Sequence, residues 1–274
     1  GTTNIPQLMS HEFARSIQTW LFLGFFASFA VKVPMWPVHT WLPDAHVQAP
    51  SSGSVILAAV LLKVGGYGMI RFLLPITPDA GFYLNDIVVT LSLVAIIYIS
   101  FVALAQKDMK KLIAYSSIAH MGFVTLGIFL TFNALSEEIT FNREMILIGL
   151  QGAVIQMISH GLISAGLFIC IGIIYTRTKS REINEQSGIG QVMPVFSALM
   201  MFFLLSNSGL PGTSGFVGEF MVLISSIEVS MVYGLMASTT LVLAASYSLW
   251  LGKRVLFGEA SKETVKNMPS LKTN

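Results

Sequence analysis

Charged residues are scarce in this sequence. Only 11% of its 274 residues are charged, 16 basic and 14 acidic, whereas 54% are hydrophobic. Soluble domains carry about a quarter charged residues, so the composition excludes a soluble enzyme and a disordered chain. The net charge of +2 supplies no basic surface for nucleic acid. A polytopic membrane protein is the class that remains.

Cysteine and the common catalytic motifs are also lacking. The single cysteine, Cys170, excludes a disulfide framework, a cysteine-ligated zinc site and an iron–sulfur cluster within this chain. No P-loop, HExxH motif, nucleophile elbow or dinucleotide fingerprint is present. His39, Asp44 and His46 form a weak metal-ligand set, because Pro43 interrupts it and a third strong ligand is missing. We therefore expect no covalent chemistry, metal or cofactor in this chain.

Long runs without charge predict membrane-spanning helices. A helix needs about 20 apolar residues to cross the hydrocarbon core. The run VVTLSLVAIIYISFVALA (88–105) is apolar on every side, which fits helices and not the alternating strands of a barrel. We expect an all-α fold with about seven transmembrane helices, at 17–38, 51–74, 85–106, 112–132, 144–176, 192–227 and 231–252.

Three of these spans carry irregularities. The runs 144–176 and 192–227 are too long for a single upright pass, which predicts an interruption, a steep tilt or an interfacial turn in each. The segment SNSGLPGTSG (206–215) cannot form regular helix, and prolines crowd the end of the first span. The residues that mark the two discontinuous helices are Pro34, Pro37, Gly209, Pro211, Gly212 and Gly215.

The basic residues predict the orientation. Segments 107–111, 177–181 and 253–272 hold 11 of the 16 basic residues. The positive-inside rule places them, the loop 39–50 and the C-terminal segment 255–274 on the cytoplasmic or equivalent side, with the polar segment 1–16 outside. The chain begins without methionine and stops in a polar stretch, so we expect an internal fragment of a longer protein.

Three charged residues fall within the expected spans: Lys32, Lys63 and Glu219. A lysine in the membrane costs about 3 kcal/mol and is by default a functional hypothesis. Removal from water disfavours the charged form, so such a lysine can take up and release a proton. The alternatives are snorkelling of the lysines to an interface and, for Glu219, stabilisation of a helix N-terminus.

Three histidines lie in or beside the spans. His160 is near the centre of the fifth span, His120 is in the fourth, and His39 follows Lys32 by seven residues. His39 shares a helix face with Lys32 if that helix continues. Histidine titrates near neutral pH and suits a proton relay. The ordinary alternative for each is a structural histidine.

Five stretches, at 31–72, 106–124, 156–168, 210–223 and 247–251, carry motifs of a known family. At these motifs the sequence resembles the antiporter-like membrane subunits of respiratory complex I (NADH:quinone oxidoreductase), and among them the group called subunit M, or subunit 4 in mitochondria. Related sodium/proton antiporter subunits of the Mrp type share the lysine and W-L-P-D pattern, so an antiporter subunit stays as an alternative function. A purely structural assembly subunit is a third.

The resemblance implies an inverted-repeat fold. Residues 17–74 then supply the last two helices of the first five-helix repeat, and 85–254 supply the second repeat. Lys32, Lys63 and Glu219 match the family's functional positions. His160 and His39 match polar positions that line the central path. The family's glutamate partner of Lys32 lies upstream of this sequence.

The resemblance also implies a function. The chain is expected to be a proton-translocating membrane-arm subunit of a NADH:quinone oxidoreductase, driven by quinone reduction elsewhere in the complex. NADH, FMN, iron–sulfur clusters and quinone then belong to other subunits. Its partners are the other complex I membrane subunits, the lipid bilayer, protons and water. We expect the bacterial plasma membrane, with the mitochondrial inner membrane as the alternative.

Overall fold

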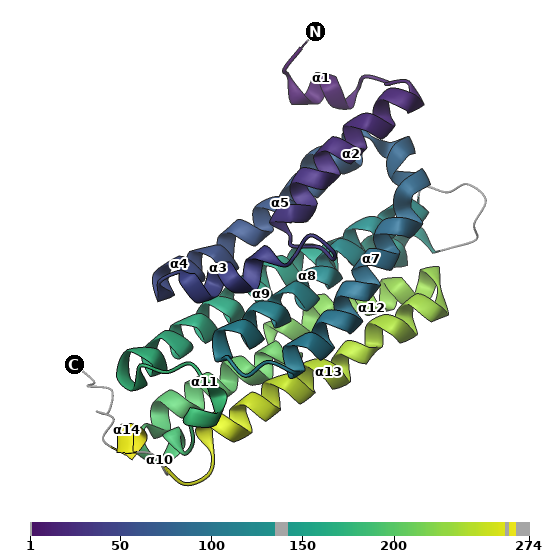
Figure 1. The fold of residues 1–274 in the computed structure, drawn as a ribbon. Helices are drawn as coiled ribbons and strands as arrows, with labels where there is room; N and C mark the ends of the chain where they lie inside the picture. The colour runs from purple at the N-terminus through teal and green to yellow at the C-terminus, as the bar shows by residue number, and fades with distance from the viewer. Residues whose placement is uncertain (1, 135–141, 261–262, 267–274) are drawn as a thin grey trace.

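The computed structural model describes residues 2–134, 142–260 and 263–266, and their regular elements are all helical (Figure 1). Long apolar helices dominate this part of the chain, as the composition predicts. Five of them are long and apolar enough to cross a membrane: Ser51–Ile76, Pro78–Leu104, Met109–Ala134, Arg143–Thr178 and Met231–Leu256. Of the remaining two expected spans, 17–38 holds a single helix that ends at Lys32, whereas 192–227 is divided mainly between two helices, Pro194–Asn207 and Ser214–Val229.

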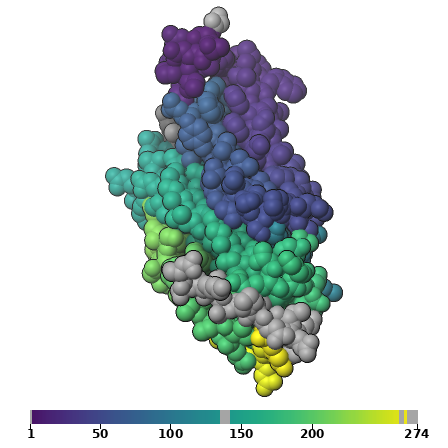
Figure 2. Space-filling view, turned by 90° about the vertical axis from the view of Figure 1, so that its left-hand side faces the viewer, coloured from purple at the N-terminus to yellow at the C-terminus, as the bar shows by residue number. Residues whose placement is uncertain are grey.

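The centre of the bundle is α8 (Met109–Ala134). Of the residues in its most apolar stretch, 94% are buried. It packs between α7 (Pro78–Leu104) and α9 (Arg143–Thr178), and α12 (Ser214–Val229) covers α9. The bundle is elongated, with the N-terminal helices in purple at one end and the described C-terminal residues in yellow at the other (Figure 2).

The outer face of α13 (Met231–Leu256) is apolar, as a membrane surface requires. Leu235, Val242 and Leu249 recur every seven residues and are 62%, 69% and 45% exposed. Seven residues are close to two helical turns, so these side chains form one stripe. A lipid-facing surface accounts for this pattern, because exposed apolar stripes are unfavourable in water.

The first break divides α2 (Arg15–Lys32) from α3 (Trp41–Gln48). Pro34 has a φ of 27°, and the bond between Trp36 and Pro37 is cis. Proline lacks the N–H that continues a helix, so the predicted interruption is confirmed. The helix ends earlier than the expected 17–38, and the expected loop 39–50 contains α3 instead. His39 therefore does not share a helix face with Lys32, and that conditional expectation is wrong.

The expected span 51–74 is a continuous rod containing two π turns, each five residues long. A π turn is rare and is frequently found at functional sites. Lys63 belongs to the α-helical segment between the two turns. In chain order the segments are α4 (Ser51–Ile56), η1 (Leu57–Leu61), α5 (Leu62–Gly68), η2 (Met69–Leu73) and α6 (Leu74–Ile76).

The second break confirms the other predicted interruption. α11 (Pro194–Asn207) ends and α12 begins at Ser214, with Gly209 and Gly212 between them at φ angles of 71° and 94°. Glycine occupies this left-handed region without steric cost. The interruption allowed for 144–176 is wrong, since α9 is continuous over 36 residues. At 1.5 Å per residue it measures about 54 Å, more than a hydrocarbon core of about 30 Å, so it is tilted or extends beyond the membrane.

The described parts of the basic segments lie at one end of the bundle, as predicted. The amide of Met109 donates to the carbonyl of Arg181 at 3.0 Å. The amide of Gly188 donates to the carbonyl of Phe257 at 3.1 Å. The expected inside-facing segment 255–274 lies partly outside the described residues. The remaining short helices are α1 (Ile5–Met9), η3 (Ile183–Glu185), α10 (Ile189–Val192) and α14 (Glu263–Lys266).

Candidate functional site

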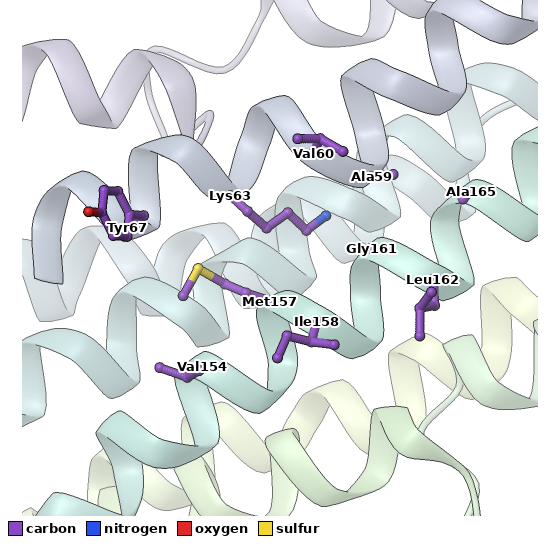
Figure 3. Close-up of a pocket in the computed structure, with 10 residues that line it drawn as sticks. All are labelled: Ala59, Val60, Lys63, Tyr67, Val154, Met157, Ile158, Gly161, Leu162 and Ala165. Atoms are coloured by element: carbon purple, nitrogen blue, oxygen red, sulfur yellow. The ribbon is translucent and has the colours of Figure 1, made fainter. Parts of the chain in front are cut away.

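Lys63 and His160 form the first contact of the site. The Lys63 Nζ donates to the carbonyl of Ala58 at 2.6 Å and lies 2.7 Å from His160 Nδ1. Figure 3 shows Lys63 reaching from its helix toward α9 beside Gly161. A Cβ at Gly161 would lie 3.0 Å from the carbonyl oxygen of Ala59, so glycine lets the two helices approach closely enough for the lysine to reach the imidazole.

Glu219, His120 and Tyr247 form a second cluster. Glu219 Oε1 lies 2.7 Å from His120 Nδ1 and accepts from Gln156 Nε2 at 3.0 Å. The Tyr247 hydroxyl lies 3.2 Å from His120 Nε2. Glu219 is 2% exposed. Its carboxylate faces side chains of α8 and α9, and among the described residues it accepts no amide of α12, so the structure does not support the helix-N-terminus alternative.

The hydrogen bonds of this second cluster fit His120 in two forms, with a neutral or with a protonated imidazole. A neutral His120 donates a hydrogen bond from Nδ1 to the Glu219 carboxylate and accepts one at Nε2 from the Tyr247 hydroxyl. A protonated His120 donates from both nitrogens, and the tyrosine oxygen then accepts. The same three side chains therefore satisfy the charged and the neutral imidazole without moving.

The two clusters face each other across a narrow polar cavity. The rings of His120 and His160 are 5.7 Å apart between centroids. Three buried atoms around this cavity have no hydrogen-bond partner among the described residues: His160 Nε2, Gln156 Oε1 and Glu219 Oε2. Buried polar atoms are normally paired, so these three leave hydrogen-bonding capacity unused around the cavity.

The second break places Glu219 at the edge of this cavity. A Cβ at Gly209 would lie 2.9 Å from Glu219 Oε2, and one at Gly218 would lie 2.7 Å from the amide nitrogen of Gln156. A Cβ at Gly215 would collide with the carbonyl oxygen of Ser206. The glycines thus let the broken helix pack against α9 with its carboxylate directed inward.

Lys32 and His39 are not brought into direct contact with these clusters. Lys32 is the last residue of α2 and is exposed. His39 lies in the break, is 7% exposed, and its Nδ1 has no hydrogen-bond partner among the described residues. No group of three metal-ligating side chains occurs in the described ranges, and Asp44 instead pairs with Lys111 at 3.1 Å.

Sequence reasoning missed several participants. Gln156 and Tyr247 were not predicted as site residues, although each is a polar side chain within an apolar span. The run of basic residues at 107–111 predicts a loop. For Lys110 this prediction is wrong, because Lys110 is on α8 and only 3% exposed. A lysine's own sequence neighbours do not show which backbone carbonyls will surround it, so charge mapping alone could not detect this burial.

Known proteins share this architecture. The family described as NADH:quinone oxidoreductase/Mrp antiporter, transmembrane, matches residues 1–244. NADH-quinone oxidoreductase subunit M of Rhodobacter capsulatus is 52% identical over 100% of this chain and 53% of its own length. NADH-ubiquinone oxidoreductase chain 4 of Chondrus crispus is 49% identical over 94% of this chain and 50% of its own. The chain thus spans about half the length of these relatives.

Solved structures agree with the helical fold. A chain of respiratory complex I from Thermus thermophilus superimposes with a TM-score of 0.87 at 30% identity, covering 99% of this chain and 54% of that chain. A chain of the Mrp complex from Dietzia sp. superimposes with a TM-score of 0.80 at 23% identity, covering 94% and 46%, which shows a shared fold alone. The chain is a membrane protein that belongs to the family of transmembrane subunits common to NADH:quinone oxidoreductases and Mrp antiporters.

Proposed function

We propose that this chain is the proton-conducting part of a membrane-arm subunit in a NADH:quinone oxidoreductase. The observation that carries the proposal is the row of four ionisable side chains from four helices: Lys63, His160, His120 and Glu219. Its two end contacts are both 2.7 Å, and its two imidazoles face each other across a polar cavity. The names of the relatives at 44–52% identity support the reaction.

The row suggests a sequence of proton transfers. The Lys63 ammonium gives a proton to His160 Nδ1, which breaks an N–H bond on lysine and forms one on the ring. His160 releases a proton from Nε2, which has no partner among the described residues, and His120 gains one at Nε2, where the Tyr247 hydroxyl turns from donor to acceptor. His120 passes a proton from Nδ1 to the Glu219 carboxylate. Lysine ends neutral and glutamic acid protonated, ready to release on the outer side.

The cavity between the imidazoles sets a requirement on this path. It is too narrow for a water molecule in this structure, and ring centroids 5.7 Å apart leave the two rings short of a direct hydrogen bond through His160 Nε2. A small separation of α8, α9 and α12 that admits one water would complete the path. Transfer is then conditional on helix movement, which fits a pump better than an open channel.

The drive must come from outside this chain. Moving one charge against 100 mV costs about 2.3 kcal/mol. We infer that electron transfer to quinone in other subunits supplies it, and that those subunits hold NADH, FMN, the iron–sulfur clusters and quinone. We further propose that Lys32, which is exposed at the end of α2, responds to an acidic partner, and that His39 contributes to the same path.

The two broken helices support the division into repeats that is expected from the sequence. We propose that 17–74 completes one repeat and 85–254 forms the other, each with a broken helix. The compartment is the bacterial plasma membrane or, as the alternative, the mitochondrial inner membrane, since relatives at similar identity come from both bacteria and algae.

The proposal is tested with Lys63→Ala in the full-length complex, reconstituted into sealed vesicles. We expect proton uptake per NADH oxidised to fall while the complex still assembles. Lys253→Ala is the matched control, because Lys253 is an exposed lysine at the end of α13, and its uptake should equal that of the parent. Undiminished uptake in Lys63→Ala would contradict the proposal. Proton movement that requires Na⁺ and not quinone reduction would favour the antiporter alternative.

A further inference from the structure

The C-terminal end of α3 is held by two cations from other parts of the chain. A helix C-terminus leaves carbonyl oxygens without partners and carries partial negative charge. The Lys110 Nζ donates to the carbonyl of Ala49 at 2.9 Å and to that of His46 at 3.1 Å. Arg181 Nη1 donates to the carbonyl of Val47 at 2.7 Å. The C-terminal end of α3 is thus fixed by a residue of α8 and by a residue of the segment that follows α9.

Lys110 differs from the basic residues around it. It is 3% exposed, and the third oxygen it meets is the Ser54 hydroxyl at 3.4 Å. Within the described residues its ammonium forms no ion pair with a carboxylate; Asp108 pairs instead with Arg181, at 3.4 Å. A buried cation satisfied only by neutral oxygens is costly. Its burial therefore points to a task that an exposed lysine could not perform.

α3 carries a buried histidine toward the row of ionisable residues. His46 is 0% exposed and stacks on Phe168, with ring centroids 4.4 Å apart and planes 13° apart. Neither of its ring nitrogens has a hydrogen-bond partner among the described residues. Phe168 belongs to α9, the helix that also carries His160. The stack and the placement of α3 are therefore what hold the His46 ring in position.

We propose that Lys110 is a positioning residue for the proton relay: by binding the carbonyls at the end of α3, it holds His46 against Phe168 of α9, the helix that also carries His160. The contact is direct, since one of the two carbonyls that Lys110 binds belongs to His46 itself. The Ser54 hydroxyl donates to the same oxygen at 3.1 Å. This inference rests on the proposed function for its consequence, but the placement of α3 can be measured separately.

The experiment uses the full-length complex with Lys110→Met, which keeps the length and removes the charge, and Lys110→Arg, which keeps the charge and its donors. Lys110→Gln is made in parallel as a milder neutral variant, so that poor assembly of Lys110→Met does not end the test. Two quantities are measured: hydrogen exchange of the amides of residues 45–49, and proton uptake per NADH in vesicles. Lys111→Met is the matched control, because Lys111 also meets α3 but through an exposed pair with Asp44.

We expect exchange at 45–49 to become at least about tenfold faster in the two neutral variants, as loss of a charge-assisted hydrogen bond predicts. Proton uptake should fall with it, and Lys110→Arg should restore both. The control should change exchange by less than about twofold, since exposed ion pairs contribute little.

Two results would overturn the inference. Unchanged exchange at 45–49 in the neutral variants shows that Lys110 does not hold α3, whatever happens to uptake. Faster exchange with normal uptake shows that α3 placement does not serve the relay. Because exchange is measured independently of pumping, faster exchange still supports the placement of α3 by Lys110 if Lys63→Ala shows that the proposed function itself is wrong.

Discussion

At the scale of residues, the site combines buried side chains whose partners change role when a proton moves. Tyr247 shows this most clearly, because its hydroxyl can donate to a neutral His120 or accept from a charged one. Tyr247 is 0% exposed, so water cannot replace it. The tyrosine therefore stabilises both states of the histidine.

Tyr247→Phe tests this role. The change removes one hydrogen bond and leaves His120 Nε2 buried without a partner, which should lower stability by about 1–3 kcal/mol. Proton uptake should slow but persist, because His120 keeps its contact with Glu219. Thermal unfolding of the purified complex and vesicle uptake measure the two effects. A variant with parent stability and parent uptake would show that the hydroxyl has no part in the site.

At the scale of elements, glycine determines how closely the broken helix approaches α9. Gly218 faces the backbone of Gln156, where an added Cβ would lie 2.7 Å from the amide nitrogen. Such a methyl group must displace one helix, and that displacement also moves Glu219, the next residue. Close packing of this helix pair and the position of the carboxylate therefore depend on the same residue.

Gly218→Ala should destabilise the subunit by about 1–3 kcal/mol through overpacking and reduce uptake. Gly24→Ala is the control, since nothing lies within 4 Å of a Cβ at that helical position. Replacing glycine by alanine inside a helix favours folding by about 0.5–1 kcal/mol, so the control should be neutral or slightly more stable. Thermal unfolding in detergent compares the two. Equal effects at both positions would contradict the packing argument.

Much of the element structure could be predicted from the sequence, because the membrane imposes strong composition rules. Charge-free runs located the long helices, and proline and glycine located both breaks. The π turns beside Lys63 could not be predicted, since Leu57–Leu61 and Met69–Leu73 have ordinary helix-forming sequences. For α9 the length alone left an interruption, a tilt or an interfacial turn open, and the helix is unbroken over 36 residues because none of them requires an interruption.

The ionisable members of the candidate site were predictable, but its neutral polar members and the pairing were not. Lys63, His160 and Glu219 stood out because polar residues are rare in apolar spans. The contact of His120 with Glu219 joins residues 99 positions apart, and no local pattern encodes it. The opposite error occurred at Lys110, where a run of basic residues suggested solvent and the fold buries one of them.

At the scale of the whole molecule, the account makes Lys63 and Glu219 the two ends of one path. Residues on one path fail together, so blocking either end should have the same effect as blocking both. Residues that act independently produce losses that add. The distinction applies to the assembled complex, because the energy for transfer comes from outside this chain.

The most direct measurement is proton uptake per NADH in vesicles containing Lys63→Ala, Glu219→Gln or both changes in the full-length complex. The account predicts that the two single variants and the double variant share one reduced ratio, with normal assembly in all three. A double variant whose loss equals the sum of the single losses, or a single variant with the parent ratio, would contradict the claim that these residues form one proton path.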